Sequence, residues 1–300
     1  KNKLNIMIYH QVFEQRDVMR PSEPDLATFT WQMELIKKYY TPLSLPDALA
    51  LIAKDKLPKN AVCITFDDGY VNNLEVAAPL LAKLSIPASV YIATGFSHGE
   101  NMWNDRLLDL ANNPKLSALD LSLLNEESRI LTDQESRIKT AHFLIGKIKY
   151  LPYQQRKELI DKLYQLHYIE ESEPRMMTPT QIVELSKLGI EIGAHTVDHP
   201  ILKVNDEETQ FQQMKESKKL LEQWLKKPVT GFAYPNGKYQ IDYDEKTRDL
   251  AKEVGFTYAL STNWGVSEKD TDKWQLNRFT PWDQTALKFH LRLIRNSLGI

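Results

Sequence analysis

The sequence contains a single cysteine and no long apolar run. Because Cys63 has no second cysteine to pair with, an internal disulfide and a zinc cluster built from several thiolates are both excluded. Cys63 lies in the apolar run 61–64, where we expect a small core side chain. No apolar stretch approaches the roughly 20 residues of a membrane-spanning helix, so we expect no stable membrane insertion.

The chain also lacks a strong excess of charge and an opening signal peptide. A formal net charge of -2 gives no reason to expect nucleic acid as a partner. The absence of a signal peptide favours the cytoplasm. Because the chain begins at Lys1 rather than at methionine, export to the periplasm or cell surface is the alternative, if an upstream signal peptide was removed.

Short apolar runs alternate with amphipathic helical patterns along most of the 300 residues. This alternation predicts a parallel sheet with right-handed crossovers, and no long linker divides the chain. We therefore expect one α/β domain spanning 1–300. Thr28 is expected to cap its first helix. The expected strands are 4–9, 61–66, 88–93, 190–194, 230–234 and 256–260, with helices near 45–52, 74–84, 180–188, 207–225 and 245–254.

The region from about 97 to 179 interrupts this rhythm. It is charged and rich in helical patterns, and it enters after one strand and leaves before the next helix. This position predicts an expanded loop between a strand and a helix. In a barrel such loops line the catalytic face, although a helical appendage packed on the side is an equally good interpretation.

The stretch Thr65-Phe66-Asp67-Asp68-Gly69-Tyr70 places two adjacent acids directly after a buried strand. Burying an unpaired carboxylate is expensive. A helix cap would explain one acid, but not two in a row. We therefore interpret Asp67 and Asp68 as part of a functional site.

Other polar groups also follow strands: His10, the pair His195 and His199, and the segment 234–237. In a parallel barrel these strand ends meet at one face. With Asp68, the two histidines would supply two nitrogens and one oxygen to a metal, as a catalytic zinc site requires, although Fe(II) accepts the same ligands. Asp67, beside this ligand set, is placed to act as a base.

Together, the segments 65–70 and His195-Thr196-Val197-Asp198-His199 resemble the first two motifs of the polysaccharide deacetylases, also called the NodB-homology domain or carbohydrate esterase family 4. The resemblance implies a distorted (β/α)7 barrel, here with a helical insertion on its catalytic face. It also implies removal of acetyl groups from N-acetylated amino sugars in polysaccharides or oligosaccharides. By the same resemblance, Asp67 is the base, and the metal ligands are Asp68, His195 and His199. Zinc is the default metal, with Ni²⁺, Co²⁺ and Fe²⁺ as alternatives.

The segment 231–237 resembles the third family motif, in which a backbone N–H near the aromatic residue, here Tyr234, stabilises the oxyanion. Many members carry an arginine in this motif that orients the base, and this segment has none. Arg278 is a candidate substitute, and a surface arginine is the alternative.

The late histidine that serves as the acid in most members is also not evident. His290 lies in an expected terminal helix and is interpreted as structural. In the exopolysaccharide poly-N-acetylglucosamine deacetylases, which the chain resembles in its Tyr9-His10 pair, an early histidine takes the acid role. We therefore expect His10 to be the acid, against the alternative of a core histidine.

Several tryptophans are candidates for sugar contacts. Trp103 either stacks on a sugar face or is buried beside an Asn/Asp cap of the helix 106–111. Trp264, Trp274 and Trp282 suggest an aromatic wall near the later loops, although tryptophans are also common in cores.

Two other functions fit parts of this pattern. A two-histidine, one-carboxylate Fe(II) oxygenase would use the same ligands, but such sites usually occur in antiparallel jelly rolls. An inactive barrel that only binds carbohydrate would explain the absent late histidine, yet the intact set of Asp67, Asp68, His195 and His199 opposes it.

Overall fold

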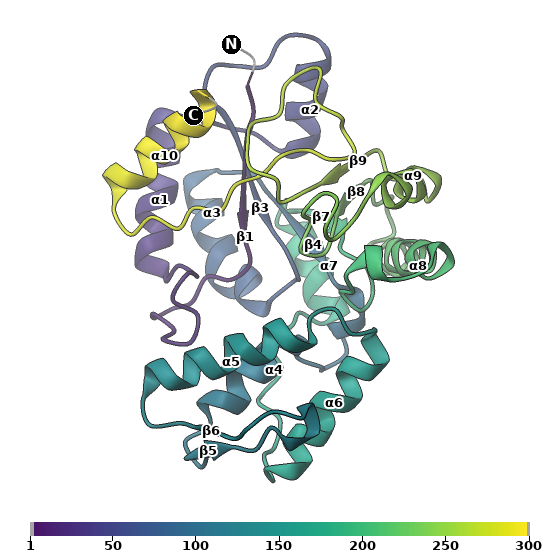
Figure 1. Cartoon of the computed structure of the whole chain (residues 1–300). Helices are drawn as coiled ribbons and strands as arrows, with labels where there is room; N and C mark the ends of the chain where they lie inside the picture. Colours follow the sequence, from purple (N-terminus) through teal and green to yellow (C-terminus); the bar gives the residue numbers. More distant parts are fainter. Residues whose placement is uncertain (1–2, 299–300) are drawn as a thin grey trace.

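The computed structural model describes residues 3–298 and shows a curled parallel sheet surrounded by helices (Figure 1). The strands run in the order β1-β3-β4-β7-β8-β9, and each neighbouring pair is parallel. This confirms the predicted barrel class. The strands are β1 (Asn5–Tyr9), β3 (Ala61–Phe66), β4 (Ala88–Ile92), β7 (Glu191–Ala194), β8 (Gly231–Ala233) and β9 (Tyr258–Leu260), and β2 (Thr41–Pro42) pairs with β3.

A late segment occupies the space between the first and last strands of this sheet. Leu276 forms a parallel bridge with Leu260 of β9, and Phe279 forms one with Met7 of β1. The side chains of 276, 278 and 279 are buried. This placement brings Arg278 into the interior next to β3, which no local sequence pattern indicates.

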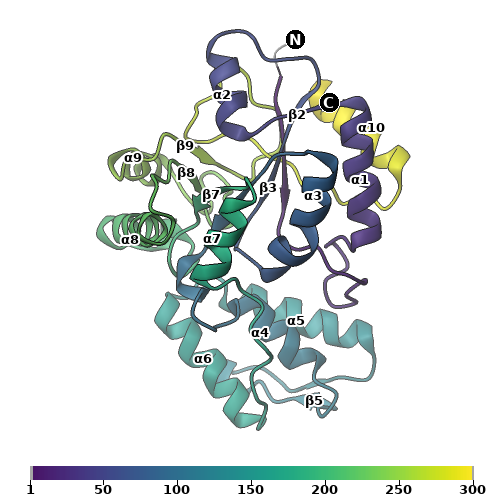
Figure 2. The ribbon, with the colours of Figure 1, turned by 180° about the vertical axis from the view of Figure 1, so that it is seen from behind.

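Helices cover the outside of the sheet, as Figures 1 and 2 show from opposite sides. The first helix corrects one prediction, because Asp25 is its cap and accepts a hydrogen bond from the Thr28 backbone N–H, while Thr28 lies inside the helix. The helices are α1 (Leu26–Tyr39), α2 (Leu45–Ala53), α3 (Ala78–Leu84), α7 (Pro179–Lys187), α8 (Glu207–Leu225), α9 (Glu245–Glu253) and α10 (Ala286–Leu298), with a π-helical turn at Asn73–Ala77 and 3₁₀ turns at Thr94–Phe96 and Leu202–Val204.

The core forms between the sheet and these helices. All six residues of β3 are buried, as the unbroken apolar run predicts for a strand covered on both faces. Cys63 is among them, in agreement with its expected core role. In the described part of the chain, no helix has the length and apolarity needed to cross a bilayer.

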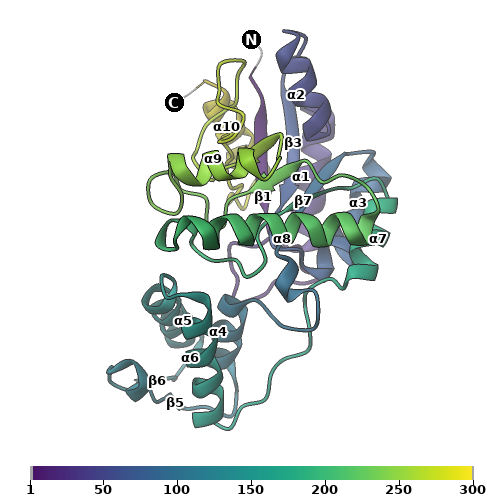
Figure 3. The same ribbon diagram turned by 90° about the vertical axis from the view of Figure 1, so that its right-hand side faces the viewer.

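The region between β4 and α7 forms a separate helical lobe at the end of the barrel where the strands finish (Figure 3). It contains α4 (Trp103–Asn112), α5 (Gln134–Ile148), α6 (Tyr153–Leu166), a 3₁₀ turn at Ser122–Leu124, and a small hairpin of β5 (Ala118–Leu119) and β6 (Arg129–Ile130). The lobe has its own apolar core, built around residues such as Leu107, Leu144 and Leu163. Since it lies at the carboxyl ends of the strands, it is positioned to wall the site.

Candidate active site and metal centre

The two acids of the segment 65–70 lie at the end of β3, where the backbone makes a tight turn. Asp68 adopts a left-handed conformation with φ of +74°, and Gly69 follows with φ of +93°. This positive φ favours glycine at position 69, and a Cβ there would lie 2.9 Å from the end of the Ile92 side chain, which would have to move. The turn holds both carboxylates at the open end of the sheet.

The structure brings Asp68, His195 and His199 together. The Nε2 atoms of both histidines lie 3.4 Å from Asp68 Oδ1, and all three residues are buried. The Nδ1 atom of His195 is 2.7 Å from the Ala233 carbonyl, which fixes the ring with its Nε2 lone pair toward the cluster.

These residues fit a divalent cation. Asp68 Oδ1 is fully buried and has no hydrogen-bond partner among the described residues, which is costly unless a bound group satisfies it. Two imidazole nitrogens and one carboxylate oxygen form a donor set typical of catalytic metal sites with open positions.

The protonation states suit metal binding as well. Burial lowers the pKa of His199 to about 3, so its ring is neutral near pH 7. Burial raises the pKa of Asp68, but the facing imidazoles of His195 and His199 outweigh that effect and hold the pKa well below its usual range. A neutral imidazole and an ionised carboxylate are the forms that bind metal.

Asp67 is held by Arg278 in a two-pronged contact. Arg278 Nη1 donates to Asp67 Oδ1 at 2.8 Å and Nη2 donates to Oδ2 at 2.7 Å, while Nε donates to the Ser261 carbonyl. Arg278 is fully buried, so the alternative of a surface arginine is wrong. Burial raises the pKa of Asp67, whereas the positive charge of the Arg278 guanidinium lowers it. The lowering effect is larger, so the net shift of the pKa is downward.

His10 lies in the same cavity as Asp67, beside a carboxylate that the sequence did not indicate. Its Nδ1 atom is 3.8 Å from Glu23 Oε1, and its side chain is 38% exposed. Burial alone lowers the pKa of His10, but the charges of Glu23, Asp68 and Asp67 raise it more, so the net shift is upward. Glu23 was missed because it sits in a polar, proline-containing stretch with no periodic pattern.

The Tyr234 backbone N–H, the expected oxyanion donor, already has a hydrogen-bond partner in this structure. It donates to the Leu260 carbonyl at 3.1 Å, because the β8–β9 ladder continues one residue past β8. The Tyr234 side chain is fully buried and donates to the Trp274 carbonyl. Asn236, two residues later, lines the cavity instead, with φ of +55°.

The Asp–His–His cluster, Asp67 and His10 all line one cavity of about 630 Å³. Its barrel wall includes His10, Asp67, Asp68, His195, His199, Asn236, Thr262 and Thr280, and its other wall comes from the helical lobe, including Trp103, Asp105, Leu108, Ile145 and Lys149. The lobe therefore lines the site, which agrees with the first of the two interpretations that its position in the sequence allowed.

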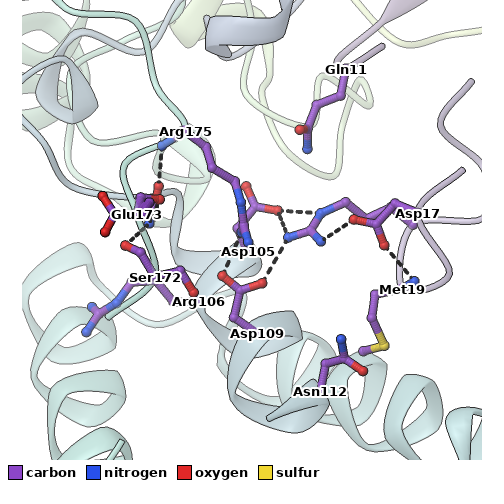
Figure 4. Close-up of polar contacts among 12 residues, drawn as sticks. Gln11, Asp17, Met19, Asp105, Arg106, Asp109, Asn112, Ser172, Glu173 and Arg175 are labelled. Atoms are coloured by element: carbon purple, nitrogen blue, oxygen red, sulfur yellow. Dashed lines mark hydrogen bonds and ion pairs between the residues drawn. The ribbon is translucent and has the colours of Figure 1, made fainter. Parts of the chain in front are cut away.

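An ionic cluster attaches the lobe to the barrel (Figure 4). Arg20, from the loop after β1, donates through Nε to Asp105 of α4 at 2.8 Å and through Nη1 to Asp17 at 3.0 Å. Asp105 also accepts a hydrogen bond from the Tyr70 hydroxyl at 2.7 Å. Asp105 thereby joins the loop that carries His10, the turn that carries Asp67 and Asp68, and the lobe.

The second acid of α4 extends the cluster to the end of the lobe. Arg175 Nη1 donates to Asp109 Oδ2 at 2.6 Å (Figure 4). Helix α4 begins at Trp103 and has no side-chain cap, so the expected Asn/Asp cap is wrong. Asp105 lies inside the helix and accepts hydrogen bonds from Arg20 and Tyr70 instead.

Of the candidate aromatic residues, only some are exposed. Trp103 is buried, and the Arg156 guanidinium lies 4.5 Å from the centre of its ring, so this ring is packed rather than open to a sugar. Trp274 packs against the core, whereas Trp264 and Trp282 are 51% and 46% exposed. His290 stacks on Tyr39 on the outside of the barrel, in keeping with a structural role.

Fold and site together form a parallel barrel whose open end joins an Asp–His–His cluster, suited to a divalent cation, to an arginine-held carboxylate, an arrangement typical of metal-dependent hydrolases. The polysaccharide deacetylase family model matches residues 130–259, which include both histidines of the cluster. The match covers less than half of the chain, and members of the polysaccharide deacetylase family generally depend on a divalent metal.

Curated relatives agree with this family. YxkH of Bacillus subtilis (strain 168), assigned as a polysaccharide deacetylase, is 24% identical over 277 residues, which cover 92% of this chain and 70% of YxkH. A poly-beta-1,6-N-acetyl-D-glucosamine N-deacetylase of Staphylococcus aureus (strain MSSA476) is 32% identical over 119 residues, or 39% of either chain.

Solved structures share the fold. The Streptococcus pyogenes deacetylase PplD, in complex with acetate, superimposes with a TM-score of 0.65 and 19% identity, covering 97% of both chains. IcaB from Ammonifex degensii gives a TM-score of 0.63 and 16% identity, covering 98% of this chain and 97% of IcaB.

Proposed function

We propose that the protein is a metal-dependent N-deacetylase that removes acetyl groups from N-acetylhexosamine units of a polysaccharide or oligosaccharide. The observation that carries this proposal is the placement of Asp67, which Arg278 orients and whose Oδ2 lies 4.0 Å from His195 Nε2 of the metal cluster. The named activity of the S. aureus relative makes N-acetylglucosamine polymers the first substrates to test.

Asp68, His195 and His199 would hold the cation, with zinc as the default and Ni²⁺, Co²⁺ or Fe²⁺ as alternatives. Such a cation supplies a Lewis acid that polarises the acetyl carbonyl and lowers the pKa of water to about 7.

Asp67 and His10 would carry the two proton transfers. The lowered pKa of Asp67 keeps its carboxylate ionised and able to accept a proton from the attacking water, whose oxygen forms the new bond to the acetyl carbon. The carbon–nitrogen bond then breaks while His10 donates a proton to the leaving nitrogen, giving acetate and a free amine. The raised pKa of His10 favours its protonated form, which this donation needs.

We place the oxyanion donor at Asn236 rather than at Tyr234. The Asn236 side of the turn lines the cavity, and its backbone N–H has no hydrogen-bond partner among the described residues. A backbone N–H held in a rigid turn costs little reorganisation when charge develops on the acetyl oxygen.

The test is acetate release from acetylated glucosamine oligomers by metal-stripped protein, with and without added Zn²⁺, alongside His10→Ala. We expect activity that returns with metal and collapses in the variant. Activity that survives in the variant would move the acid role away from His10.

Two results would instead support the competing functions. Glycan binding without acetate release would indicate an inactive carbohydrate-binding barrel. Turnover that depends on oxygen and 2-oxoglutarate would indicate an Fe(II) oxygenase, which the parallel sheet disfavours. Location in the cytoplasm, or outside it after loss of a leader, remains a prediction.

A further inference from the structure

Helix α6 of the lobe carries a buried arginine that contacts the turn holding His199, the second histidine of the Asp–His–His cluster. Arg156 is only 1% exposed, and its Nη2 atom donates to the backbone carbonyls of Asp198 at 3.2 Å and of His199 at 3.3 Å. No other hydrogen bond reaches these two carbonyls among the described residues. The contact therefore joins the lobe to the backbone of a candidate metal ligand.

Arg156 occupies an unfavourable position for a cation. Burial lowers the pKa of Arg156 to about 10, and no carboxylate of the described residues forms an ion pair with it. Its guanidinium instead lies against the ring of Trp103, 4.5 Å from the ring centre. Because a buried charge without a partner carboxylate costs free energy, packing alone does not account for an arginine at this position.

The turn 196–199 needs support because two of its residues have left-handed backbones. Thr196 has φ of +67° and His199 has φ of +49°, and this region is unfavourable for residues other than glycine. Gln213 of α8 holds the middle of the turn, since its Oε1 atom accepts hydrogen bonds from two backbone N–H groups of the turn. At the end of the turn, the His199 N–H donates to Thr196 Oγ1 and the His199 carbonyl accepts from Arg156.

The two histidines of the cluster are held in different ways. The His195 ring is fixed through its Nδ1 atom, which lies 2.7 Å from the Ala233 carbonyl. The Nδ1 atom of His199 is buried and has no hydrogen-bond partner in the part of the chain that the structure describes, so no such bond orients this ring. The position of the His199 ring therefore depends on its backbone, and the lobe contacts that backbone through Arg156.

We propose that Arg156 is a positioning residue for His199, through which the helical lobe sets the affinity of the site for its divalent cation. The proposal rests on the metal-dependent function proposed above and gives the lobe a role beyond lining the cavity. Loss of a group that orients a metal ligand typically weakens metal binding about 10- to 100-fold. Arg156 acts only through the backbone of the turn, so it takes no part in the proton transfers.

The experiment compares the dissociation constant for Zn²⁺ of the wild type with that of Arg156→Met, measured on metal-stripped protein by competition with a coloured chelator. Methionine fills much of the same space without a donor, so we expect Zn²⁺ binding to be about tenfold weaker. Arg137→Met is the matched control, because Arg137 of α5 also donates to three backbone carbonyls, but within the lobe. It should destabilise the protein without changing Zn²⁺ affinity. Wild-type affinity in Arg156→Met, or equal losses in both variants, would overturn the proposal.

A second pair of variants decides the question if Arg156→Met does not fold. Arg156→Lys keeps a charged donor on a shorter side chain, so we expect a smaller loss of Zn²⁺ affinity, and Arg137→Lys should show none. Wild-type affinity in Arg156→Lys would then overturn the proposal.

Zn²⁺ affinity is measured without turnover, so the positioning role and the proposed function fail separately. Tight Zn²⁺ binding by a wild type that releases no acetate would remove the deacetylase assignment, and the Arg156 comparison would still decide the positioning role. A wild type that binds neither Zn²⁺ nor Co²⁺ would overturn both.

Discussion

Two buried arginine–aspartate pairs lie at the catalytic cavity, and they join different parts of the molecule. Arg278 and Asp67 come from the barrel itself, 211 residues apart, and the guanidinium holds both oxygens of the carboxylate. Arg20 and Asp105 join the loop after β1 to the helical lobe, and only one oxygen of Asp105 contacts Arg20. The other oxygen accepts the Tyr70 hydroxyl.

The two pairs therefore differ in what they constrain. In the first pair, the arginine lowers the pKa of Asp67, the proposed base, whose carboxylate borders the Asp–His–His cluster. In the second pair, burial raises the pKa of Asp105, against the opposing effect of Arg20, and its contacts tie three segments together. We call Arg278–Asp67 the barrel pair and Arg20–Asp105 the lobe pair. The comparison indicates that the barrel pair supports the proposed base and that the lobe pair holds the walls of the cavity together.

The largest effect should come from removing a ligand of the metal cluster. In His199→Ala one of the three donors is lost, so we expect bound Zn²⁺ and acetate release both to fall to background. Metal content by elemental analysis and acetate release are the measurements. His167→Ala, which changes a histidine in the lobe outside the cluster, is the control. Full metal content in His199→Ala would contradict the ligand assignment.

The second largest effect should come from breaking the barrel pair, Arg278–Asp67. Arg278→Met leaves Asp67 as a buried carboxylate without its cation, which should lower the free energy of unfolding by about 3–5 kcal/mol and reduce kcat sharply. Urea denaturation and acetate release measure the two effects. Arg248→Met removes a partly exposed pair with Asp272 and should cost at most about 1 kcal/mol without changing kcat. Wild-type kcat in a folded Arg278→Met protein would show that Arg278 does not support the base.

Breaking the lobe pair should affect stability more than chemistry. Asp105→Asn keeps an acceptor for Tyr70 but removes the charge facing Arg20, so we expect a loss of about 1.5–3 kcal/mol in the free energy of unfolding. The fall in kcat should be smaller than for Arg278→Met. Lys157→Ala, which breaks an exposed pair between the lobe and Glu100, is the control. A larger loss of kcat in Asp105→Asn than in Arg278→Met would reverse the comparison between the two pairs.

The smallest effect should be a shift in pH dependence. The negative charge of Glu23 raises the pKa of His10, so Glu23→Gln should lower that pKa. Since His10 must be protonated to act as an acid, the alkaline limb of kcat/KM should move to lower pH. Glu14→Gln, an exposed residue of the same loop, should leave the limb in place. An unmoved limb in Glu23→Gln would mean that another group sets it.

Many residues of the candidate site could be predicted from the sequence because they lie at the ends of strands. Asp67, Asp68, His195 and His199 each follow a buried apolar run, and a parallel barrel brings such ends together whatever their separation in sequence. The fold class could be predicted for the same reason, since strand and helix patterns alternate.

The remaining parts depend on tertiary contacts that no local pattern encodes. The position of Arg278 is set by the closing segment between β9 and β1, and that of Glu23 by a loop without periodicity. The sequence did not show that the Tyr234 N–H is used in β8–β9 pairing, which leaves it unavailable as the expected oxyanion donor. The contacts of Asp105 depend on how the lobe docks, and its sequence suggested only a helix cap.

The central claim is that Asp67 acts as the base beside a metal held by other residues. Asp67→Asn tests it directly, with bound Zn²⁺ and acetate release measured on the same sample. We expect unchanged metal content, a lower unfolding midpoint because the buried Arg278 loses its charged partner, and acetate release slowed by at least about 100-fold. Acetate release at the wild-type rate from a folded, metal-loaded Asp67→Asn protein would contradict the account.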